Sequence, residues 1–271
     1  MTTTTVLEIP QWQASASPTA RRLTEGAGLL AGLFPDADHV RVPIADEPGT
    51  AAAVRSADVL RRNLAAVRES LAAIPDDTLL VTVGGDCAVD LAPVERAHAR
   101  YGDRLALVWL DAHGDLNTPA SSPSKAFHGM ILRALLGEGP ADLLPARPLS
   151  PSRVVLAGAR ALDAGERAFL DAGPLRHLPP AALTPEALAA AVADTGAEAV
   201  YLHLDLDVLD PGTFASVGTP EPGGLTPEAL SAAVQALAGG FALAGMAITE
   251  YEPRSPEDQK TLETLAGTFL P

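Results

Sequence analysis

Short runs of apolar residues alternate along this chain with longer stretches that are rich in alanine, leucine and arginine. The apolar runs are continuous rather than alternating in polarity, as Leu105 to Leu110 illustrates. Such continuity is typical of a parallel strand that is buried on both faces. The stretches between the runs have the length and composition of helices. The pattern therefore predicts strands and helices that alternate along the whole chain.

Seven apolar runs are predicted to form strands, and eight of the other stretches are predicted to form helices. The strands are Val6 to Pro10, His39 to Val42, Leu79 to Val83, Leu105 to Leu110, Arg153 to Ala157, Ala199 to Leu204 and Leu243 to Thr249. The helices are Pro18 to Leu33, Ala51 to Ala73, Val89 to Arg100, Ala126 to Leu136, Gly165 to Ala172, Thr184 to Ala193, Thr226 to Ala238 and Pro256 to Phe269. Thr184-Pro185 and Thr226-Pro227 each place a capping hydroxyl before a proline at the first helical position.

This alternation predicts an α/β fold with a doubly wound, mostly parallel sheet. A barrel of eight βα units is the alternative, but the unequal unit lengths and the long loop after Asp111 favour an open sheet. No repeat of 20 to 50 residues and no linker divides the sequence. We therefore expect residues 1–271 to form one domain.

The charge balance narrows the range of partners. The chain has 19 Lys+Arg against 34 Asp+Glu, a formal net charge of -15. This balance argues against nucleic acid as the main partner and is compatible with a small cationic ligand. Cys87 is the single cysteine, which excludes a disulfide scaffold.

Two segments bear on the location of the protein. Met1 to Pro10 has no basic region followed by an apolar core, so we expect a cytoplasmic protein without a secretory signal. Ala229 to Thr249 is uncharged and long enough to cross a membrane, but Gly239-Gly240 divides it into a predicted helix and a predicted strand. We therefore expect no membrane insertion.

Acidic clusters follow four of the predicted strands. They are Gly84-Gly85-Asp86-Cys87, Asp111-Ala-His113-Gly-Asp115-Leu-Asn117, Asp205-Leu-Asp207-Val-Leu-Asp210, and Glu250. The carboxyl ends of neighbouring parallel strands border one crevice, so residues far apart in sequence can meet there. Where the chain leaves a strand, alternate residues point the same way, which aims the side chains of Asp111, His113 and Asp115 at one point.

Several carboxylates and an imidazole in one crevice would repel one another unless cations held them. Carboxylate-rich sites with some imidazole suit Mn²⁺ well, and the number of acids indicates two ions with shared ligands. Isolated acids after strands are more often helix caps, and Asp86, Asp163 and Asp210 are open to that interpretation. His98 and His177 are expected on the surface. Gly84-Gly85 is read as a tight turn, because P-loop and dinucleotide motifs are absent.

At this point the sequence resembles the arginase or ureohydrolase family. The segments that support this are Gly84-Gly85-Asp86, Asp111 to Pro119, His128-Gly129, Asp205 to Pro211, Gly218 to Pro220, Gly223 to Thr226 and Glu250, all in family order. The resemblance implies a three-layer α/β fold, two manganese ions, and hydrolysis of guanidino compounds to urea and an amine. By family resemblance, the chain would also form a homotrimer or a homohexamer.

The resemblance also implies a role for each residue. The metal ligands would be Cys87, Asp111, His113, Asp115, Asp205 and Asp207, of which Asp111 and Asp205 would bridge both ions. A bridging hydroxide would attack the guanidinium carbon. The catalytic residues would be His128 as proton shuttle, Glu250 as the acid that orients the guanidinium, and Asp115. The substrate-binding residues would be Asn117, Ser124, Asp163, Thr219 and Glu250.

Several positions depart from the family pattern. Cys87 stands where most members have histidine, and as a softer ligand it would favour Zn²⁺ over Mn²⁺. Ala247 and Gly114 replace a common acid and a common hydroxyl residue, and Glu221 is more typical of agmatinase-like members. Arginine is the first substrate expected, followed by agmatine, guanidinobutyrate and formiminoglutamate.

Two other functions remain open from the sequence. The chain could be a catalytically silent family member that binds an amino acid or a partner and regulates. It could also be a related amidohydrolase of acylated amines, which would use a single zinc ion. The retention of His128 and Glu250 favours hydrolysis of a guanidino or formimino group over a silent member. Two bound ions would count against the single-zinc amidohydrolase.

Overall fold

The computed structural model describes residues 3–50, 52–173 and 175–269. Its strands are β1 (Thr4–Ile9), β2 (Asp38–Arg41), β3 (Leu79–Gly84), β4 (Leu105–Leu110), β5 (Val154–Ala157), β6 (Arg176–Leu178), β7 (Ala199–Asp205) and β8 (Ala242–Thr249). Its helices are α1 (Leu23–Ala31), α2 (Ala57–Ala72), α3 (Leu91–Tyr101), α4 (Ile131–Leu135), α5 (Ala164–Asp171), α6 (Pro185–Ala193), α7 (Pro227–Gly240) and α8 (Pro256–Phe269).

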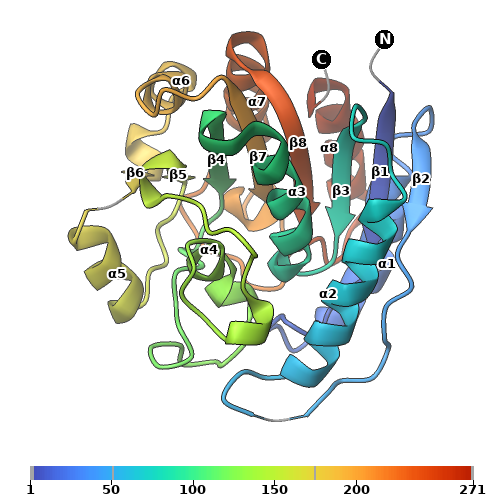
Figure 1. Ribbon diagram of the computed structural model, residues 1–271. Coiled ribbons are helices and arrows are strands. Elements are labelled where there is room, and N and C mark those ends of the chain that lie inside the picture. The colour runs from blue at the N-terminus through green and yellow to red at the C-terminus, as the bar shows by residue number, and fades with distance from the viewer. Residues whose placement is uncertain (1–2, 51, 174, 270–271) are drawn as a thin grey trace.

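The strands form one open, parallel sheet in the order β2-β1-β3-β8-β7-β4-β5-β6 (Figure 1). The outer strands β2 and β6 do not pair with each other, so the sheet does not close. The prediction of a doubly wound α/β sheet is confirmed, and the alternative of a barrel is wrong.

Helices cover both faces of the sheet and make three layers. Buried residues of α2, α3 and α4 pack on the face that Figure 1 shows, and those of α1, α6, α7 and α8 pack on the other. Along β4, Leu105, Leu107 and Trp109 belong to the first core, and the residues between them belong to the second. This double burial explains why the strand is apolar at every position.

The helix starts that the sequence marks most strongly lie as predicted. Both α6 and α7 begin with proline, and the preceding hydroxyls of Thr184 and Thr226 each accept a hydrogen bond from a backbone N–H at 3.2 Å. Other boundaries differ. Residues 18–22 form turns before α1, and residues 126–130 form turns before α4. The helix predicted from Ala51 begins at Ala57, and Ala51 itself lies outside the described residues.

One strand escaped prediction. β6 is an edge strand of three residues, Arg176–Leu178, none of them fully buried, so its sequence lacks the apolar run that marks the inner strands. The uncharged stretch from Ala229 to Thr249 forms a helix followed by a strand, as predicted, because α7 ends at Gly240 and β8 begins at Ala242. None of the helices in the described part of the chain combines the length and apolar character that crossing a membrane requires.

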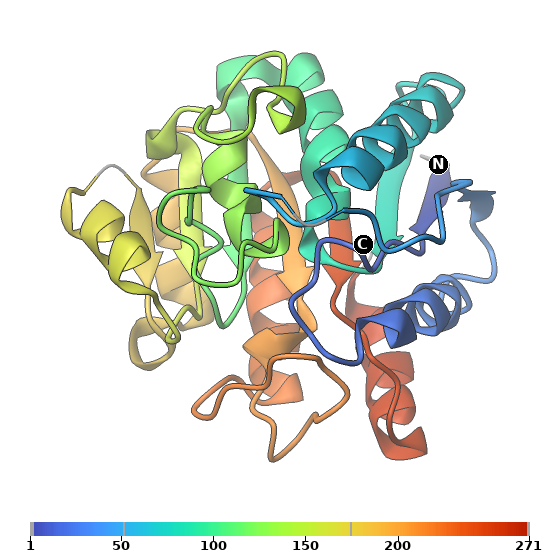
Figure 2. The same ribbon diagram turned by 90° about the horizontal axis from the view of Figure 1, so that it is seen from below.

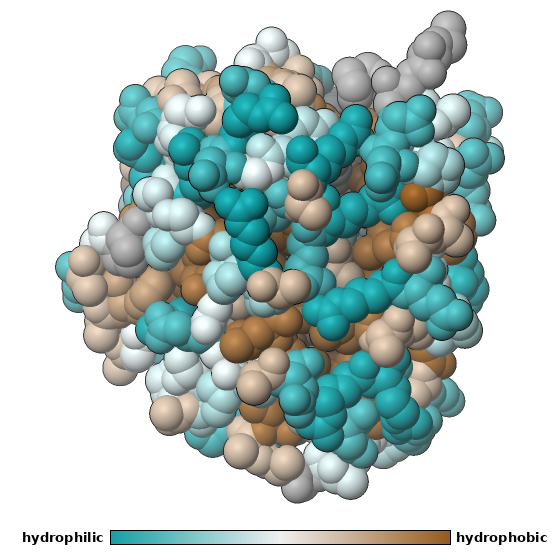
Figure 3. All heavy atoms as spheres, viewed as in Figure 1, coloured by the Kyte–Doolittle hydropathy of each residue, from teal (hydrophilic) through white to brown (hydrophobic). Residues whose placement is uncertain are grey.

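The surface carries little large apolar area. On the face in Figure 3, hydrophilic residues cover most of α2, α3 and α4, and hydrophobic ones appear in smaller areas between them. Among the described residues, Leu29 is the one large hydrophobic side chain that counts as exposed, at 36%.

The four strands that the acidic clusters follow are neighbours in the sheet: β3, β8, β7 and β4. Because all of them are parallel, their carboxyl ends lie side by side at one edge. Figure 2 views this edge, where the loops after β1, β4 and β7 gather. The fold thus brings the clusters from four distant parts of the sequence to one place.

Candidate metal centre and active site

The acids at the ends of β4 and β7 share one pattern: each uses one oxygen to hold the local backbone. Oδ1 of Asp111 accepts from the N–H of His113 at 2.6 Å, and Oδ1 of Asp205 accepts from the N–H of Asp207 at 2.7 Å. Oδ1 of Asp207 accepts from the N–H of Ala112 at 3.1 Å, which joins the two strand ends. These bonds fix the carboxylates, and their second oxygens are left for other partners.

His113 lies between two of these acids. Its Nδ1 is 3.0 Å from Oδ2 of Asp207 and 3.5 Å from Oδ1 of Asp111. Donor atoms of these three residues all lie within 4.8 Å of one another, as the ligands of a single ion would. Burial lowers the pKa of His113, but the charges and hydrogen bonds of Asp207 and Asp111 together outweigh burial, so the pKa is raised. The charge and hydrogen bond of His113, with further hydrogen bonds, lower the pKa of Asp207 against the effect of burial. A proton on His113 thus occupies the position that a cation would take.

Cys87 belongs to a second group of donors. Its Sγ is 3.1 Å from Oδ2 of Asp205 and 3.5 Å from Oγ1 of Thr249, and it forms a potential metal-binding set with Asp205 and Glu250. Burial, followed by the charge of Asp205, raises the pKa of the thiol. A nearby cation has the opposite effect on a thiol, so a metal ion is what would make Cys87 a ligand.

Two acids of the site sit on strained backbone. Asp115 has a φ of 52° and Glu250 a φ of 59°, in the left-handed region that costs residues other than glycine about 1–3 kcal/mol. Oδ2 of Asp115 and Oε2 of Glu250 are buried and have no hydrogen-bond partner within the described residues. Strain and unsatisfied oxygens together are typical of a site built for a ligand.

The electrostatics of the cluster fit divalent cations. Burial, and then the charge of Asp111, raises the pKa of Asp115. Burial, and then the charge of Asp207, raises the pKa of Asp205. Without cations these acids therefore hold protons that divalent ions would replace. The donor sets, the unsatisfied oxygen of Asp115 and the raised pKa values together fit the two ions that the family resemblance implies.

His128 and Glu250 form a separate pair beside the acids. Nδ1 of His128 is 3.1 Å from Oε1 of Glu250, which also accepts from the N–H of Cys87 at 3.2 Å. Nε2 of His128 accepts from the N–H of Ala16 at 3.1 Å, so the ring carries its proton on Nδ1. Burial lowers the pKa of His128, but the hydrogen bond to Glu250 and the charges of Glu250 and Asp86 together outweigh burial, so the pKa is raised.

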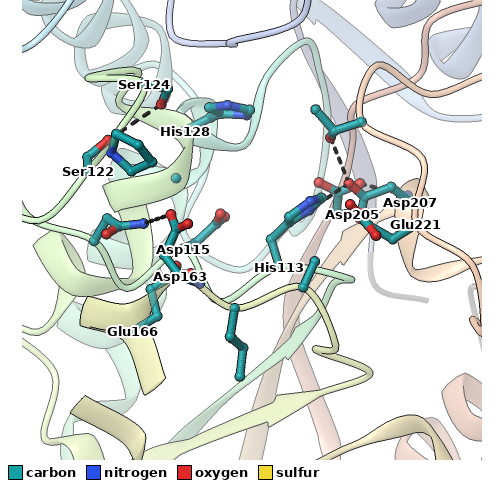
Figure 4. Close-up of a pocket in the computed structure, with 16 residues that line it drawn as sticks. His113, Asp115, Ser122, Ser124, His128, Asp163, Glu166, Asp205, Asp207 and Glu221 are labelled. Carbon is teal, nitrogen blue, oxygen red and sulfur yellow. Dashed lines mark hydrogen bonds and ion pairs between the residues drawn. The ribbon is translucent and has the colours of Figure 1, made fainter. Parts of the chain in front are cut away.

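A cavity of about 370 Å³ opens over these groups (Figure 4). Figure 4 shows His113 with Asp205, Asp207 and Glu221 on one side of the cavity and Asp115 and Asp163 on the other. The predicted site residues that line it are His113, Asp115, Asn117, Ser124, His128, Asp163, Asp205, Asp207 and Thr219. The other predicted residues, Cys87, Asp111 and Glu250, are fully buried and do not line it.

The residues proposed for substrate binding already have partners within the chain. Nδ2 of Asn117 donates to Oδ2 of Asp163 at 2.8 Å, and Asp163 also caps α5 together with Glu166. The hydroxyl of Thr219 donates to Oδ2 of Asp207 at 3.1 Å, and Oγ of Ser124 accepts from a backbone N–H at 3.2 Å. The interpretation of Asp163 as a helix cap therefore holds, although its side chain also faces the cavity.

Asp86 and Asp210 hold loops. Asp86 is fully buried and accepts from Nε2 of Gln11 and the N–H of Ala14, both at 2.9 Å; burial and Glu250 raise its pKa to about 7. Asp210 caps an exposed turn by accepting from Gly212 at 2.8 Å.

The turn interpretation of Gly84-Gly85 agrees with the packing. A Cβ on Gly85 would come within 1.5 Å of the carbonyl oxygen of Gln11, so any side chain there would clash with the backbone. The prediction that His98 lies on the surface is wrong. Its side chain on α3 is buried, and Nδ1 is hydrogen-bonded to the carbonyl of Arg147.

Sequence reasoning missed two buried polar residues next to the site, His203 and Asp90. His203 Nδ1 lies 2.9 Å from Oδ2 of Asp90, and His203 forms a third potential metal-binding group with Cys87 and Asp111. One signal was present: His203 stands two residues before Asp205 on the same strand, so both point to the same face. Asp90 gave no comparable signal, because it meets His203 across 113 positions of sequence.

Comparison with known proteins bears on the whole chain. The sequence model of the arginase family matches residues 19–270. An arginase of Staphylococcus aureus (strain COL) is 31% identical over 215 residues, 75% of this chain and 71% of that protein. The N(omega)-hydroxy-L-arginine amidinohydrolase of Streptomyces lavendulae is 31% identical over 256 residues, 94% of this chain and 87% of that protein.

A solved structure resembles the fold closely. It is the arginase of Entamoeba histolytica in complex with L-ornithine, with a TM-score of 0.89 at 21% identity over 99% of both chains. The match of the family model over nearly all of the chain confirms the resemblance that the motifs indicated.

Proposed function

We propose that this chain, which belongs to the arginase family and is an amidinohydrolase, cleaves a small guanidino compound that carries a second positive charge. The observation that supports this most is the charge of the cavity wall. The acids that line it are Asp115, Asp163, Glu166, Asp205, Asp207 and Glu221, and neither lysine nor arginine appears among the described lining residues. Such a wall attracts cations and repels anions.

The metal centre would be held by the predicted ligands. Asp111 and Asp205 would serve both ions, His113 and Asp207 would complete the set at one of them, and Cys87 and Asp115 would lie at the other. Two divalent ions lower the pKa of water and polarise the group under attack, and so supply a nucleophile at neutral pH. Mn²⁺ is the first expectation, and Zn²⁺ is the alternative because Cys87 is a soft donor.

Glu250 would orient the guanidinium. Its Oε1 is held by His128 and by the N–H of Cys87, and its Oε2 is unpartnered. A carboxylate that is fixed at one oxygen can accept from a guanidinium N–H at the other and hold the reacting carbon in place. An acid at this position would pair with a guanidinium better than with a neutral amide.

His128 would handle the proton. It lines the cavity, and it holds a proton on Nδ1 against Glu250. In that place it can pass the proton to the leaving amine and recover another from solvent. The two residues would therefore act together, one on the carbon that is attacked and one on the nitrogen that leaves.

The other end of the substrate would meet Asn117, Ser124 and Asp163. These side chains line the same part of the cavity wall, and Asp163 is charged and exposed. An α-ammonium would bind Asp163, and an α-carboxylate would bind the hydroxyl and amide donors. Arginine satisfies both, so it is our first candidate. Agmatine, which lacks the carboxylate, is the second, and Glu221 at the opposite wall favours it.

One experiment tests the proposal. The chain, loaded with manganese, is incubated with arginine, agmatine, guanidinobutyrate and formiminoglutamate, and urea or formamide is measured together with the paired amine by mass spectrometry. Formation of urea and ornithine from arginine is the expected result. Absence of turnover with the whole panel in a protein that retains two ions per chain would refute it.

The second candidate is a silent member of the family that binds a ligand and regulates. It is favoured by Cys87, whose thiol is protonated and bonded to Asp205 when no cation is bound. Such a protein would purify with less than one ion per chain. Assembly as a homotrimer or homohexamer stays a prediction of the family resemblance, which light scattering of the purified chain tests. A cytoplasmic location stays a prediction from the N-terminal sequence.

A further inference from the structure

His203 is held rigidly inside the sheet, directly below the metal centre. It lies on β7 between Trp109 of β4 and Ala247 of β8, and it is fully buried. Its ring stacks on the ring of Trp109 with centroids 3.4 Å apart and planes 4° from parallel. This stacking fixes the plane of the imidazole, so its two nitrogens can point in only two directions.

One nitrogen of His203 is assigned by its surroundings. Nδ1 lies 2.9 Å from Oδ2 of Asp90, and the hydroxyl of Tyr201 donates to the other oxygen of Asp90. Asp90 is fully buried, and a carboxylate there accepts the Nδ1–H of the ring. The lone pair of the imidazole is therefore on Nε2.

Nε2, the other ring nitrogen of His203, lies near Thr249 and Cys87. Nε2 of His203 lies 3.4 Å from the hydroxyl of Thr249, and that hydroxyl is 3.5 Å from Sγ of Cys87. Donor atoms of His203, Cys87 and Asp111 all lie within 4.8 Å of one another. A carboxylate that accepts from one ring nitrogen while the other faces a group of donors is the usual arrangement of a metal-binding histidine.

The departures from the family pattern point the same way. This chain has cysteine at position 87 and alanine at position 247, where the family resemblance implies histidine and an acid. His203 is the neighbour of Ala247 across the strand pair, and Asp90 lies three residues after Cys87. His203 and Asp90 thus supply an imidazole and an acid close to positions 87 and 247, although they stand at other positions of the sequence.

We propose that His203 binds, through Nε2, the metal ion that Cys87 borders, and that Asp90 is its positioning residue. The inference rests on the metal centre proposed above and adds a ligand to it. Thiolate, imidazole and carboxylate together are a donor set that Zn²⁺ accepts readily and Mn²⁺ accepts less well. The two ions would therefore have different ligand sets. One would be held by carboxylate oxygens and His113, and the other by the sulfur of Cys87, carboxylate oxygens and His203.

The first test needs no substitution. The full chain is stripped of metal, loaded with Zn²⁺ alone to two ions per chain, and measured by X-ray absorption at the zinc edge. If His203 binds, the average ion has one imidazole, because His113 and His203 each supply one. A zinc–sulfur distance should appear as well. Half an imidazole per ion would overturn the proposal.

The second test compares His203→Gln with the matched control His177→Gln. His177 lies on β6, away from the site, and its ring is hydrogen-bonded to the carbonyl of Ala159. Zn²⁺ affinity is measured by competition with a chelator. We expect His203→Gln to keep one tight ion and to weaken the other by at least about tenfold, and the control to bind as the parent does. Equal affinities for all three proteins would overturn the proposal.

The outcomes separate this inference from the proposed function. If the parent cleaves guanidino compounds and holds two ions but His203→Gln binds both unchanged, only the inference fails. If the zinc data show His203 bound but no guanidino compound is cleaved, only the proposed function fails.

Discussion

Nδ1 of His128 lies 3.1 Å from Oε1 of Glu250, whereas Oε2 of the same carboxylate is buried without a partner in the described part of the chain. One side chain thus holds the histidine proton with one oxygen and keeps the other for a ligand. Substrate binding at Oε2 would change the charge that His128 faces. The proposed orientation of the guanidinium and the proposed proton transfer are therefore coupled through Glu250.

Glu250→Gln should keep both metal ions and lose orders of magnitude in turnover, because a neutral amide pairs poorly with a guanidinium. Metal content by elemental analysis and initial rates of urea release check this. A variant as active as the parent would show that Glu250 does not bind a cationic substrate.

Asp111→Ala and Asp205→Ala should each abolish metal retention and turnover, because each acid is expected to serve both ions. Asp210→Ala is the control: it removes an acid of the same strand end that caps an exposed turn. The control should keep two ions per chain. Two ions in either of the first variants would contradict the proposed bridging.

Cys87→His should raise manganese affinity, because a neutral imidazole replaces a buried thiol whose pKa is raised. Manganese titration and turnover are followed in parallel. Unchanged affinity would place Cys87 outside the metal-binding shell. A gain in manganese with a loss of turnover would show that the enzyme is built around a different metal.

Asp163→Ser separates the two roles of Asp163. Serine keeps a capping oxygen for α5, so the melting temperature should change little. The lost carboxylate should raise KM for arginine several-fold, because its α-ammonium loses a charged partner. An equal KM would mean that Asp163 serves only as a cap.

Removal of the metal should reverse the pH dependence of stability around the site. The folded-state pKa values of Asp115 and Asp205 are raised above the usual 3.8 of an aspartate, and that of Asp86 is raised to about 7. The folded chain then binds more protons than the unfolded chain, so stability is lost as pH rises above about 4, at up to about 1.4 kcal/mol per pH unit for each group.

Thermal unfolding between pH 5 and pH 8 measures this effect, with a chelator in one series and saturating manganese in the other. The metal-free chain should melt at a lower temperature at pH 8 than at pH 5. The loaded chain should not, because bound cations stabilise the ionised acids. Parallel profiles would mean that the cluster holds no cation.

Features that depend on the residues of a single helix or strand could be predicted from the sequence. The strand from Leu105 is apolar throughout because both of its faces are buried, and the Thr-Pro pairs fix two helix starts through a local hydrogen bond. β6 was missed because a three-residue edge strand with Arg176 and His177 buries too little to leave a pattern.

The candidate site divides in the same way. Asp111, His113 and Asp207 could be predicted, because parallel strands place their ends at one edge. The pairing of His203 with Asp90 could not, because it depends on how the turn after β3 settles beneath β7, which neither local sequence specifies. Contacts between segments that are distant in sequence depend on tertiary packing, which local sequence patterns do not specify.

The place of β8 has a consequence for how the protein is made. β8 is the last strand in sequence, yet it lies in the middle of the sheet, between β3 and β7. Until residues 242–249 have been synthesised, β3 and β7 each lack the partner that they have on one side in the folded sheet, so the strand groups β2-β1-β3 and β7-β4-β5-β6 cannot be joined. Cys87 belongs to the first group, and Asp111 and Asp205 belong to the second. The predicted metal ligands of the two groups are therefore not brought together, and the edges of β3 and β7 stay unpaired and open to aggregation, until β8 joins them.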